Sequence, residues 1–203
     1  MPRTITRAES KRLTRQRLLD AAIEILSESG SSKLSTGNIA RRAGVAQPTF
    51  YVHFRDKDEL LRTLAESNVE LMRAPLRQAR ANLGQGAEPV RSAFRIPLDA
   101  MLNHPELFVL SLRERLDDAS PFGARARELT DELKADLRDD LVALGVEQRT
   151  KRQREKLALV VDALVGLTET MALGLIEKRY DSIEATVDLL IGAAQGMIPT
   201  LAE

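Results

Sequence analysis

The sequence predicts an all-α protein on three observations. Aromatic residues make up only 3% of the 203 residues and charged residues 30%, a composition that favours helical over all-β chains. Apolar residues recur at helical spacing between turns marked by Gly and Pro, and no segment reads as a strand. The chain is long enough to bury a substantial core, and we expect it to divide into residues 1–64 and residues 65–203.

The first part is expected to contain four helices. Cap and turn residues place them over residues 10–29, 35–43, 47–54 and from 56 onward. Gly30 is the expected C-terminal cap of the first helix, and Ser35 the N-terminal cap of the second. Pro48 stands in the first turn of the third helix, where it costs no hydrogen bond. Asp56 and Glu59 approximate a capping box that opens the fourth helix.

The long helix from residue 56 continues into the second part, and five further helices are expected beyond Gly84–Gly86. Gly, Pro and Asp residues between them place these helices over residues 89–103, 105–116, 122–144, 147–176 and 182–201. The richest apolar stretch runs from Leu157 to Leu167, is interrupted by Asp162 and is far shorter than a membrane span. A membrane is therefore not an expected partner.

The composition conflicts with several classes of function. The absence of cysteine excludes disulfides, thiol catalysis and thiolate metal sites. The two histidines, His53 and His104, leave little for a His-based metal centre, and no nucleophile motif or phosphate-binding Gly-rich loop accompanies them. The first residues lack the apolar stretch of a secretory signal. We therefore expect a cytoplasmic protein that is not an enzyme and that uses no metal or other cofactor.

The net charge of zero conceals an asymmetry along the chain. Residues 1–65 contain 12 Lys and Arg against 7 Asp and Glu, whereas residues 66–203 contain 18 against 23. The basic excess is concentrated in the first 17 residues, which hold six Lys or Arg and one Glu. Such a basic end favours contact with a polyanion, although a solvated basic tail would show the same charge.

The segment from Leu34 to Leu60 carries the clearest functional pattern. Two short helices separated by AGV give the layout of a helix-turn-helix, whose second helix enters the major groove of DNA. At about 100° per residue, Phe50 and Phe54 share one face and are expected to bury against the preceding short helix. The same layout also occurs as a packing unit in all-α proteins that bind no DNA.

The outward side chains of this segment divide by chemistry into two groups. Glutamine can bind adenine through two hydrogen bonds, and the carbons of Pro48, Thr49 and Val52 can touch thymine methyl groups. Hydroxyl, imidazole and ammonium groups can bind phosphates, and the start of a helix favours an anion. The expected base contacts are Gln47, Pro48 and Thr49, and the expected phosphate contacts are Ser35, Thr36, Tyr51, His53 and Lys57.

This segment resembles the DNA-binding domain of the TetR family of bacterial transcriptional regulators. The family pattern is an apolar residue and Thr, then IAxxAGV, then TxYxxFxxKxxL, and it appears here between Leu34 and Leu60. The resemblance covers about residues 12–64. It implies a helix-turn-helix domain with a basic N-terminal arm over residues 1–64. A helical domain for ligand binding and dimerisation would follow over residues 65–203. The resemblance also implies the same base contacts, and phosphate contacts from Thr36, Tyr51, His53 and Lys57.

Three positions depart from the pattern of the tetracycline-responsive members of the family. Gly37 stands where they carry a base-reading Arg, and Val52 replaces a bulkier aromatic residue. Ala46 replaces the usual Ser cap, which is expected to weaken the start of that helix by about 1 kcal/mol. The operator is therefore expected to differ from theirs.

A homodimer is expected, because high specificity for DNA usually comes from two half-sites spaced by a helical turn or a multiple of one. The last two long helices are apolar enough to form the interface, and the resemblance implies a four-helix bundle built from both subunits. The interface residues expected are Leu157, Val161, Leu164, Val187, Leu190, Ile191, Ala194 and Ile198. The same faces could instead form the core of one chain.

The middle helices are expected to enclose a cavity for a small apolar effector. Its expected wall consists of Phe94, Met101, Leu102, Phe108, Leu112, Leu164, Thr168 and Met171. A weaker resemblance to the family's regulators of fatty-acid desaturation and unsaturated fatty-acid synthesis implies an acyl-CoA or fatty acid as the effector. The function expected is a ligand-responsive regulator, a repressor on a palindromic operator in double-stranded DNA. The alternative is a helical interaction protein without DNA binding.

Overall fold

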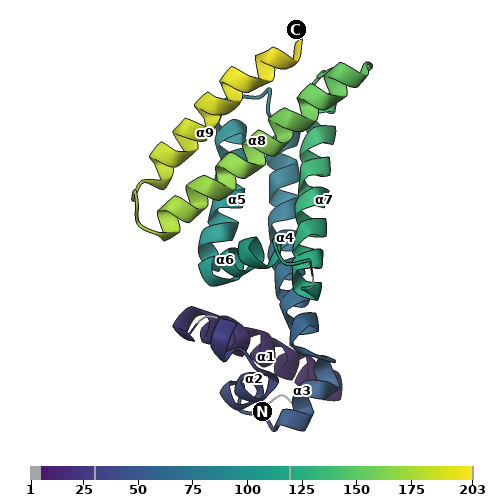
Figure 1. Cartoon of the computed structure of the whole chain (residues 1–203), viewed down its shortest axis with the longest axis vertical. Helices are drawn as coiled ribbons and strands as arrows, with labels where there is room; N and C mark the ends of the chain where they lie inside the picture. Colours follow the sequence, from purple (N-terminus) through teal and green to yellow (C-terminus); the bar gives the residue numbers. More distant parts are fainter. Residues whose placement is uncertain (1–5, 30, 119, 203) are drawn as a thin grey trace. The chain divides into compact units, whose positions relative to one another are not determined.

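The computed structural model describes residues 6–29, 31–118 and 120–202, which form helices and turns without any strand. The all-α prediction is therefore confirmed. The α-helices are α1 (Arg7–Ser29), α2 (Thr36–Arg42), α3 (Gln47–His53), α4 (Lys57–Ala81), α5 (Ala87–Asn103), α6 (Pro105–Glu114), α7 (Pro121–Ala143), α8 (Lys151–Ile176) and α9 (Ile183–Met197). Short 3-10 turns cover η1 (Ser31–Lys33) and η2 (Ile198–Ala202) (Figure 1). The expected cap Gly30 lies outside the described residues.

Caps explain where the observed helices differ from the expected ones. Thr6 and Glu9 exchange backbone-to-side-chain hydrogen bonds of 2.8 and 3.2 Å, so α1 begins earlier than expected. Thr150 forms a full capping box with Gln153, which moves the start of α8 from 147 to Lys151. Helix α9 gives way to η2 just before Pro199, because proline cannot donate the hydrogen bond that would continue an α-helix.

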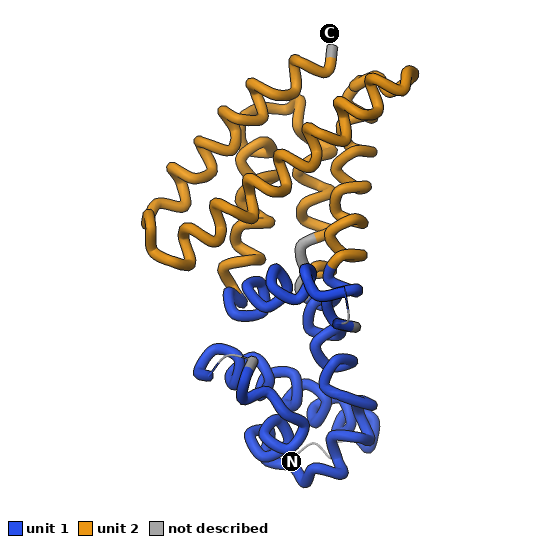
Figure 2. Tube along the Cα trace, in the orientation of Figure 1, with its two compact units in different colours: residues 1–67, 104–126 blue, residues 68–103, 127–203 orange. Residues whose placement is uncertain are grey.

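The chain forms two compact units, shown in different colours in Figure 2. The first unit contains residues 1–67 and 104–126, and the second contains residues 68–103 and 127–203. Helix α6, from the middle of the sequence, therefore belongs to the same unit as α1, α2 and α3. This division by packing is distinct from the division at residues 64 and 65, which stays a prediction.

The first unit is held together by an apolar core between α1, α2 and α3. Leu18 and Ala22 of α1 and Ile39 of α2 have no exposed surface, and Phe50 of α3 packs among the same helices. Helix α6 also packs against α1, where Ser27 donates a 3.2 Å hydrogen bond to Glu106. The core fixes α3 by its inner face and leaves the other face of this helix uncovered.

The second unit is built around α8. This helix packs against α5 and α9, and its buried residues Leu157, Val161 and Leu164 form a core with Leu141 and Ala194. By length and composition alone α8 could cross a membrane, because one window of 18 residues reaches a mean hydropathy of 1.8. The apolar helix is thus longer than the stretch from 157 to 167 suggested. Core helices have the same composition, and α8 occupies that position here.

Candidate functional site

A cap fixes the start of α2, and a glycine and an arginine fix the turn between α2 and α3. Ser35 accepts a 3.2 Å hydrogen bond from the Asn38 backbone N–H and so caps α2 as expected. Gly44 has φ +68°, a conformation that side-chain-bearing residues rarely adopt. From α1, the Arg17 guanidinium donates hydrogen bonds to the carbonyls of Ala43 and Gly44. These contacts set the angle at which α3 leaves the turn.

Helix α3 presents one face to the core and the other to solvent. Phe50 and Phe54 are 0% and 1% exposed, with ring centroids 5.7 Å apart, so their predicted burial is confirmed. On the opposite side Tyr51 is 54% exposed and Val52 65% exposed. Ala46 offers no side-chain cap to the helix, while Pro48 occupies its first turn. A short helix held by two buried rings is thus available to an external partner.

A chain of polar side chains joins the starts of α2 and α3. The amide nitrogen of Gln47 donates to the hydroxyl of Thr36 over 3.2 Å, and that hydroxyl lies 3.2 Å from the hydroxyl of Tyr51. Gly37 lies beside the glutamine amide, whose atoms are 3.8 Å from the place a β-carbon would occupy. All three polar groups are at least partly open to solvent, so they form one hydrogen-bonded surface.

Basic residues of α1 surround the C-terminal end of α3. The Arg15 guanidinium lies 4.6 Å above the Phe54 ring and also donates to Thr63 over 3.3 Å. Burial, followed by the positive charges of Lys11 and Arg15, lowers the pKa of His53 below its ordinary value. These surroundings favour the uncharged form of His53, whose Nδ1 is buried and has no hydrogen-bond partner in the described part of the chain.

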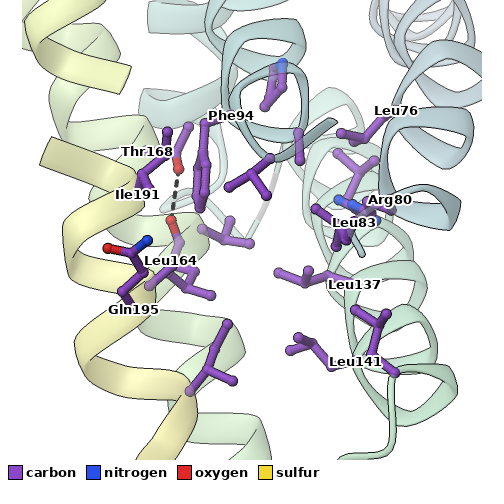
Figure 3. A pocket seen from close by; sticks show the side chains of 18 of the residues that line it. Leu76, Arg80, Leu83, Phe94, Leu137, Leu141, Leu164, Thr168, Ile191 and Gln195 are labelled. Atoms are coloured by element: carbon purple, nitrogen blue, oxygen red, sulfur yellow. Dashed lines mark hydrogen bonds between the residues drawn. The ribbon is translucent and has the colours of Figure 1, made fainter. Parts of the chain in front are cut away.

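The second unit contains an apolar cavity of about 520 Å³. Figure 3 shows Phe94, Leu164 and Ile191 on one side of the cavity and Leu76 and Leu137 on the other. Its volume lies within the range of small-molecule sites, and its lining is mostly aliphatic. A cavity of this kind favours a ligand whose bulk is apolar.

A few polar groups interrupt the apolar wall. Thr168 donates a 2.8 Å hydrogen bond to the Leu164 carbonyl, drawn as a dashed line in Figure 3. Arg80 is bound to Asp140 at 2.9 Å, so its charge is already neutralised. Pro97 lies inside α5 and cannot donate to the Ala93 carbonyl, and both residues line the cavity. These groups, with Thr130, Glu169 and Gln195 in the same lining, can orient one polar end of a ligand.

Helices α8 and α9 each carry a stripe of small and apolar residues that is open or half-open to solvent, which we call the outer face. On α8 it follows Leu159, Ala163, Gly166 and Thr170, and on α9 it follows Ala185, Leu189, Gly192 and Gly196. Leu159 is 68% exposed and Leu189 55%. A β-carbon on any of the three glycines would meet no described atom within 4 Å. A second helix could therefore approach this face closely.

Comparison with known proteins bears on what these surfaces do. Residues 18–64 match the sequence model described as bacterial regulatory proteins, tetR family. This match spans α2 and α3, the turn between them, the second half of α1 and the start of α4. Residues 18–64 belong to the TetR family of bacterial regulatory proteins. The helix-turn-helix of this segment is the part that meets DNA in such regulators.

Solved structures share the fold of this chain over nearly its whole length. A TetR-family regulator of Streptomyces coelicolor has a TM-score of 0.71 at 20% identity, with 100% of this chain and 98% of that one covered. A TetR-like regulator of Rhodococcus sp. RHA1 gives 0.64 at 23%, covering 96% of each chain. The regulator FadR of Bacillus subtilis, solved in complex with stearoyl-CoA, gives 0.62 at 17%, covering 92% and 96%.

The expected DNA-contacting residues lie in or beside α2 and α3, except Lys57, which begins α4. Gln47, Pro48 and Tyr51 are exposed, as is Ser35, although its hydroxyl already caps α2. The remaining four are half-buried: Thr36, Thr49, His53 and Lys57. Their contacts with DNA stay a prediction. Arg17 and the capping box of Thr6 and Glu9 were missed, although the pattern TxxE at Thr6 signals that cap.

The expected cavity residues fall into two groups. Phe94, Met101, Leu164 and Thr168 line the cavity, whereas Leu102, Phe108, Leu112 and Met171 are not among its lining residues. Phe108 and Leu112 lie on α6, which belongs to the first unit. Helical spacing alone cannot separate a cavity wall from an ordinary core. It also missed the contributions of α4 and α7, which supply Leu76 and Leu137.

The expected dimer residues lie mostly within the core of one chain, and their part in an interface stays a prediction. Six of them are buried within one chain: Leu157, Val161, Leu164, Val187, Leu190 and Ala194. Ile191 and Ile198 are half-buried and line the cavity. A side chain already covered by its own chain has no surface to offer a partner. The outer face supplies the exposed apolar surface of the same two helices instead.

Replacing Gly44 by alanine is expected to lower the free energy of unfolding by about 2–3 kcal/mol. Part of this is the left-handed backbone, and part is the Arg17 guanidinium, which lies 2.8 Å from the added β-carbon and must leave its carbonyl partners. Urea denaturation measures the change. Gly145→Ala is the matched control, because Gly145 has φ +99° and open space around it. Equal losses in both variants would contradict a role for Arg17.

Among the residues the structure describes, no group of three or more His, Asp or Glu is placed to hold a metal ion.

Proposed function

We propose that this chain is a repressor that binds a palindromic operator as a homodimer and is controlled by an apolar effector. The observation that carries the DNA-binding part is the uncovered face of α3, which the buried rings of Phe50 and Phe54 hold outward. Gln47, Pro48 and Thr49 would meet base edges, and Ser35, Thr36, Tyr51, His53 and Lys57 would meet phosphates. Such a regulator acts in the cytoplasm and catalyses no reaction.

Salt dependence tests the phosphate contacts. Binding to duplex operator should weaken steeply with salt, and Lys57→Ala should reduce the slope of log affinity against log salt by about 1. Fluorescence anisotropy at several salt concentrations measures this slope. Lys33→Ala is the control, because Lys33 is exposed in the same unit but is not among the proposed DNA contacts. A protein that never binds duplex DNA would be the helical interaction protein that the sequence leaves as the alternative.

The outer face is the surface we propose for the homodimer. It joins Leu159 of α8 with Leu189 of α9 and contains glycines that allow close helix approach. Two copies of these helices would make a four-helix bundle. Each subunit would then offer one α3 to a half-site, and the two half-sites would be separated by about 34 Å or a multiple of it. An effector that favours another separation would weaken binding.

A long acyl chain is the effector we propose. The cavity of about 520 Å³ is mostly aliphatic and carries few polar groups, which suits a hydrocarbon tail. The FadR structure of similar fold was solved with stearoyl-CoA, which supports this chemistry. Because Arg80 is already bound to Asp140, we expect the tail rather than the charged head to supply the affinity.

A melting experiment tests the effector. At about 100 times its Kd, stearoyl-CoA should stabilise the protein by about 2.7 kcal/mol and raise Tm by about 5–10 °C. Free coenzyme A and butyryl-CoA should leave Tm unchanged. Ala93→Trp, which fills the cavity, should remove the shift, whereas Ala87→Trp on the same helix but outside the cavity should keep it. An equal shift with free coenzyme A would refute a tail-directed site.

A further inference from the structure

We infer that Thr36 is a positioning residue that determines which base Gln47 reads, by fixing which way the glutamine amide faces. The inference rests on the proposed function, because it assumes that α3 lies in the major groove. It goes beyond that function in assigning base choice to a residue of α2 that need not touch the base. The juxtaposition behind it is Gln47, Thr36 and Tyr51 in one hydrogen-bonded chain.

The geometry restrains the glutamine amide from two sides. Its nitrogen donates to the Thr36 hydroxyl over 3.2 Å, and its three terminal atoms lie over Gly37, each 3.8 Å from an ideal β-carbon position. The missing side chain at Gly37 therefore leaves the space that the amide occupies. A long side chain there would push the amide away from Thr36.

Phosphate fixes the direction of the hydrogen bonds in the chain. A phosphate oxygen only accepts, so Tyr51 bound to it must donate its own proton outward. The Tyr51 oxygen then accepts the single hydroxyl proton of Thr36, so Thr36 meets the phosphate through Tyr51 and its own oxygen accepts from Gln47. The amide nitrogen is thereby held inward. The carbonyl oxygen and the remaining N–H of Gln47 stay available to the DNA.

This orientation selects adenine. An amide that presents a carbonyl oxygen beside one N–H matches the N6 amine and N7 of adenine. Turned by 180°, the amide would present two N–H donors outward, which match O6 and N7 of guanine. Without Thr36 both orientations become available. Thr36 therefore sets the preference at the position that Gln47 reads, and Tyr51 couples that preference to the backbone contact.

Binding selection on randomised duplexes, followed by affinity measurements, tests the inference. The wild-type protein should prefer adenine over guanine at one position of each half-site by about 5- to 150-fold. Gln47→Ala identifies that position by losing the preference there alone. Thr36→Val, which has the same shape without the hydroxyl, should reduce the preference to less than about threefold and leave the other positions unchanged. Thr36→Ser should restore it.

Tyr51→Phe tests whether the direction of the hydrogen bonds matters while Thr36 itself is kept. It removes the outward donor, so affinity should fall across all sequences while the adenine preference also weakens at the Gln47 position. Circular dichroism and melting establish that each variant is folded. If Thr36→Val lowered affinity uniformly and kept the adenine preference, Thr36 would be only a structural or phosphate contact and the inference would fail. If the wild type selected no duplex at all, the proposed function itself would fail.

Discussion

Phe50→Ala is expected to lower the free energy of unfolding by about 3–5 kcal/mol and to abolish operator binding at 37 °C. The ring is 0% exposed and contacts Phe54 at 5.7 Å and Tyr51 at 5.5 Å between centroids. Its removal loses the transfer free energy of the ring and leaves a cavity between α3 and the core. Since domains are stable by only about 5–15 kcal/mol, this loss removes a large share of the stability and leaves α3 without the side chain that anchors it.

Urea denaturation followed by helical circular dichroism measures this loss. Val52→Ala is the matched control, because Val52 lies on the same helix but is 65% exposed, and it should change stability by less than about 0.5 kcal/mol. A fall of only about 1 kcal/mol in Phe50→Ala would mean that the ring does not hold α3 in place.

The double variant Leu159→Glu, Leu189→Glu is expected to convert the dimer to a monomer and to weaken operator binding by about 100-fold or more. Each leucine is exposed in the single chain, at 68% and 55%, so glutamate leaves the fold of that chain intact. In the dimer both carboxylates would be buried against the partner without a counter-charge, which is strongly unfavourable. A monomer holds only one α3 and loses the advantage of binding two half-sites together.

Sedimentation equilibrium should give the chain mass of 22.5 kDa for this variant and twice that mass for the wild type. Leu116→Glu is the control, because Leu116 is 88% exposed but lies far from α8 and α9 in the sequence. It should remain dimeric. A double variant that stays dimeric and binds operator normally would place the interface elsewhere.

Sequence patterns described the DNA-binding segment well because its signals are local. Ser35 caps the helix that follows it, and Pro48 starts the helix in which it stands. The turn at Gly44 and the spacing of Phe50 and Phe54 likewise depend only on neighbouring residues. Arg17 could not be found in this way. Its hydrogen bonds reach a turn 26 residues further along the chain, which no local pattern records.

For the two apolar helices at the end of the chain, sequence patterns do not predict which face is buried. On α8 and α9, apolar residues occur on more than one face, so spacing alone cannot tell which face meets the same chain. Residue type does not decide it either, because Leu157 and Leu159 are both leucine, yet one is fully buried and the other is 68% exposed. The neighbours of α8 make that difference.

Local patterns were sufficient for the helical class, the helix-turn-helix and the residues with the chemistry to meet DNA, because periodicity, caps and turn residues act over short distances. Three features required the packed chain: the apolar residues that line the cavity, the face of α8 and α9 that stays exposed, and the hydrogen bond from Gln47 to Thr36. Those outcomes depend on which helices pack together and on the side-chain rotamers that this packing leaves open.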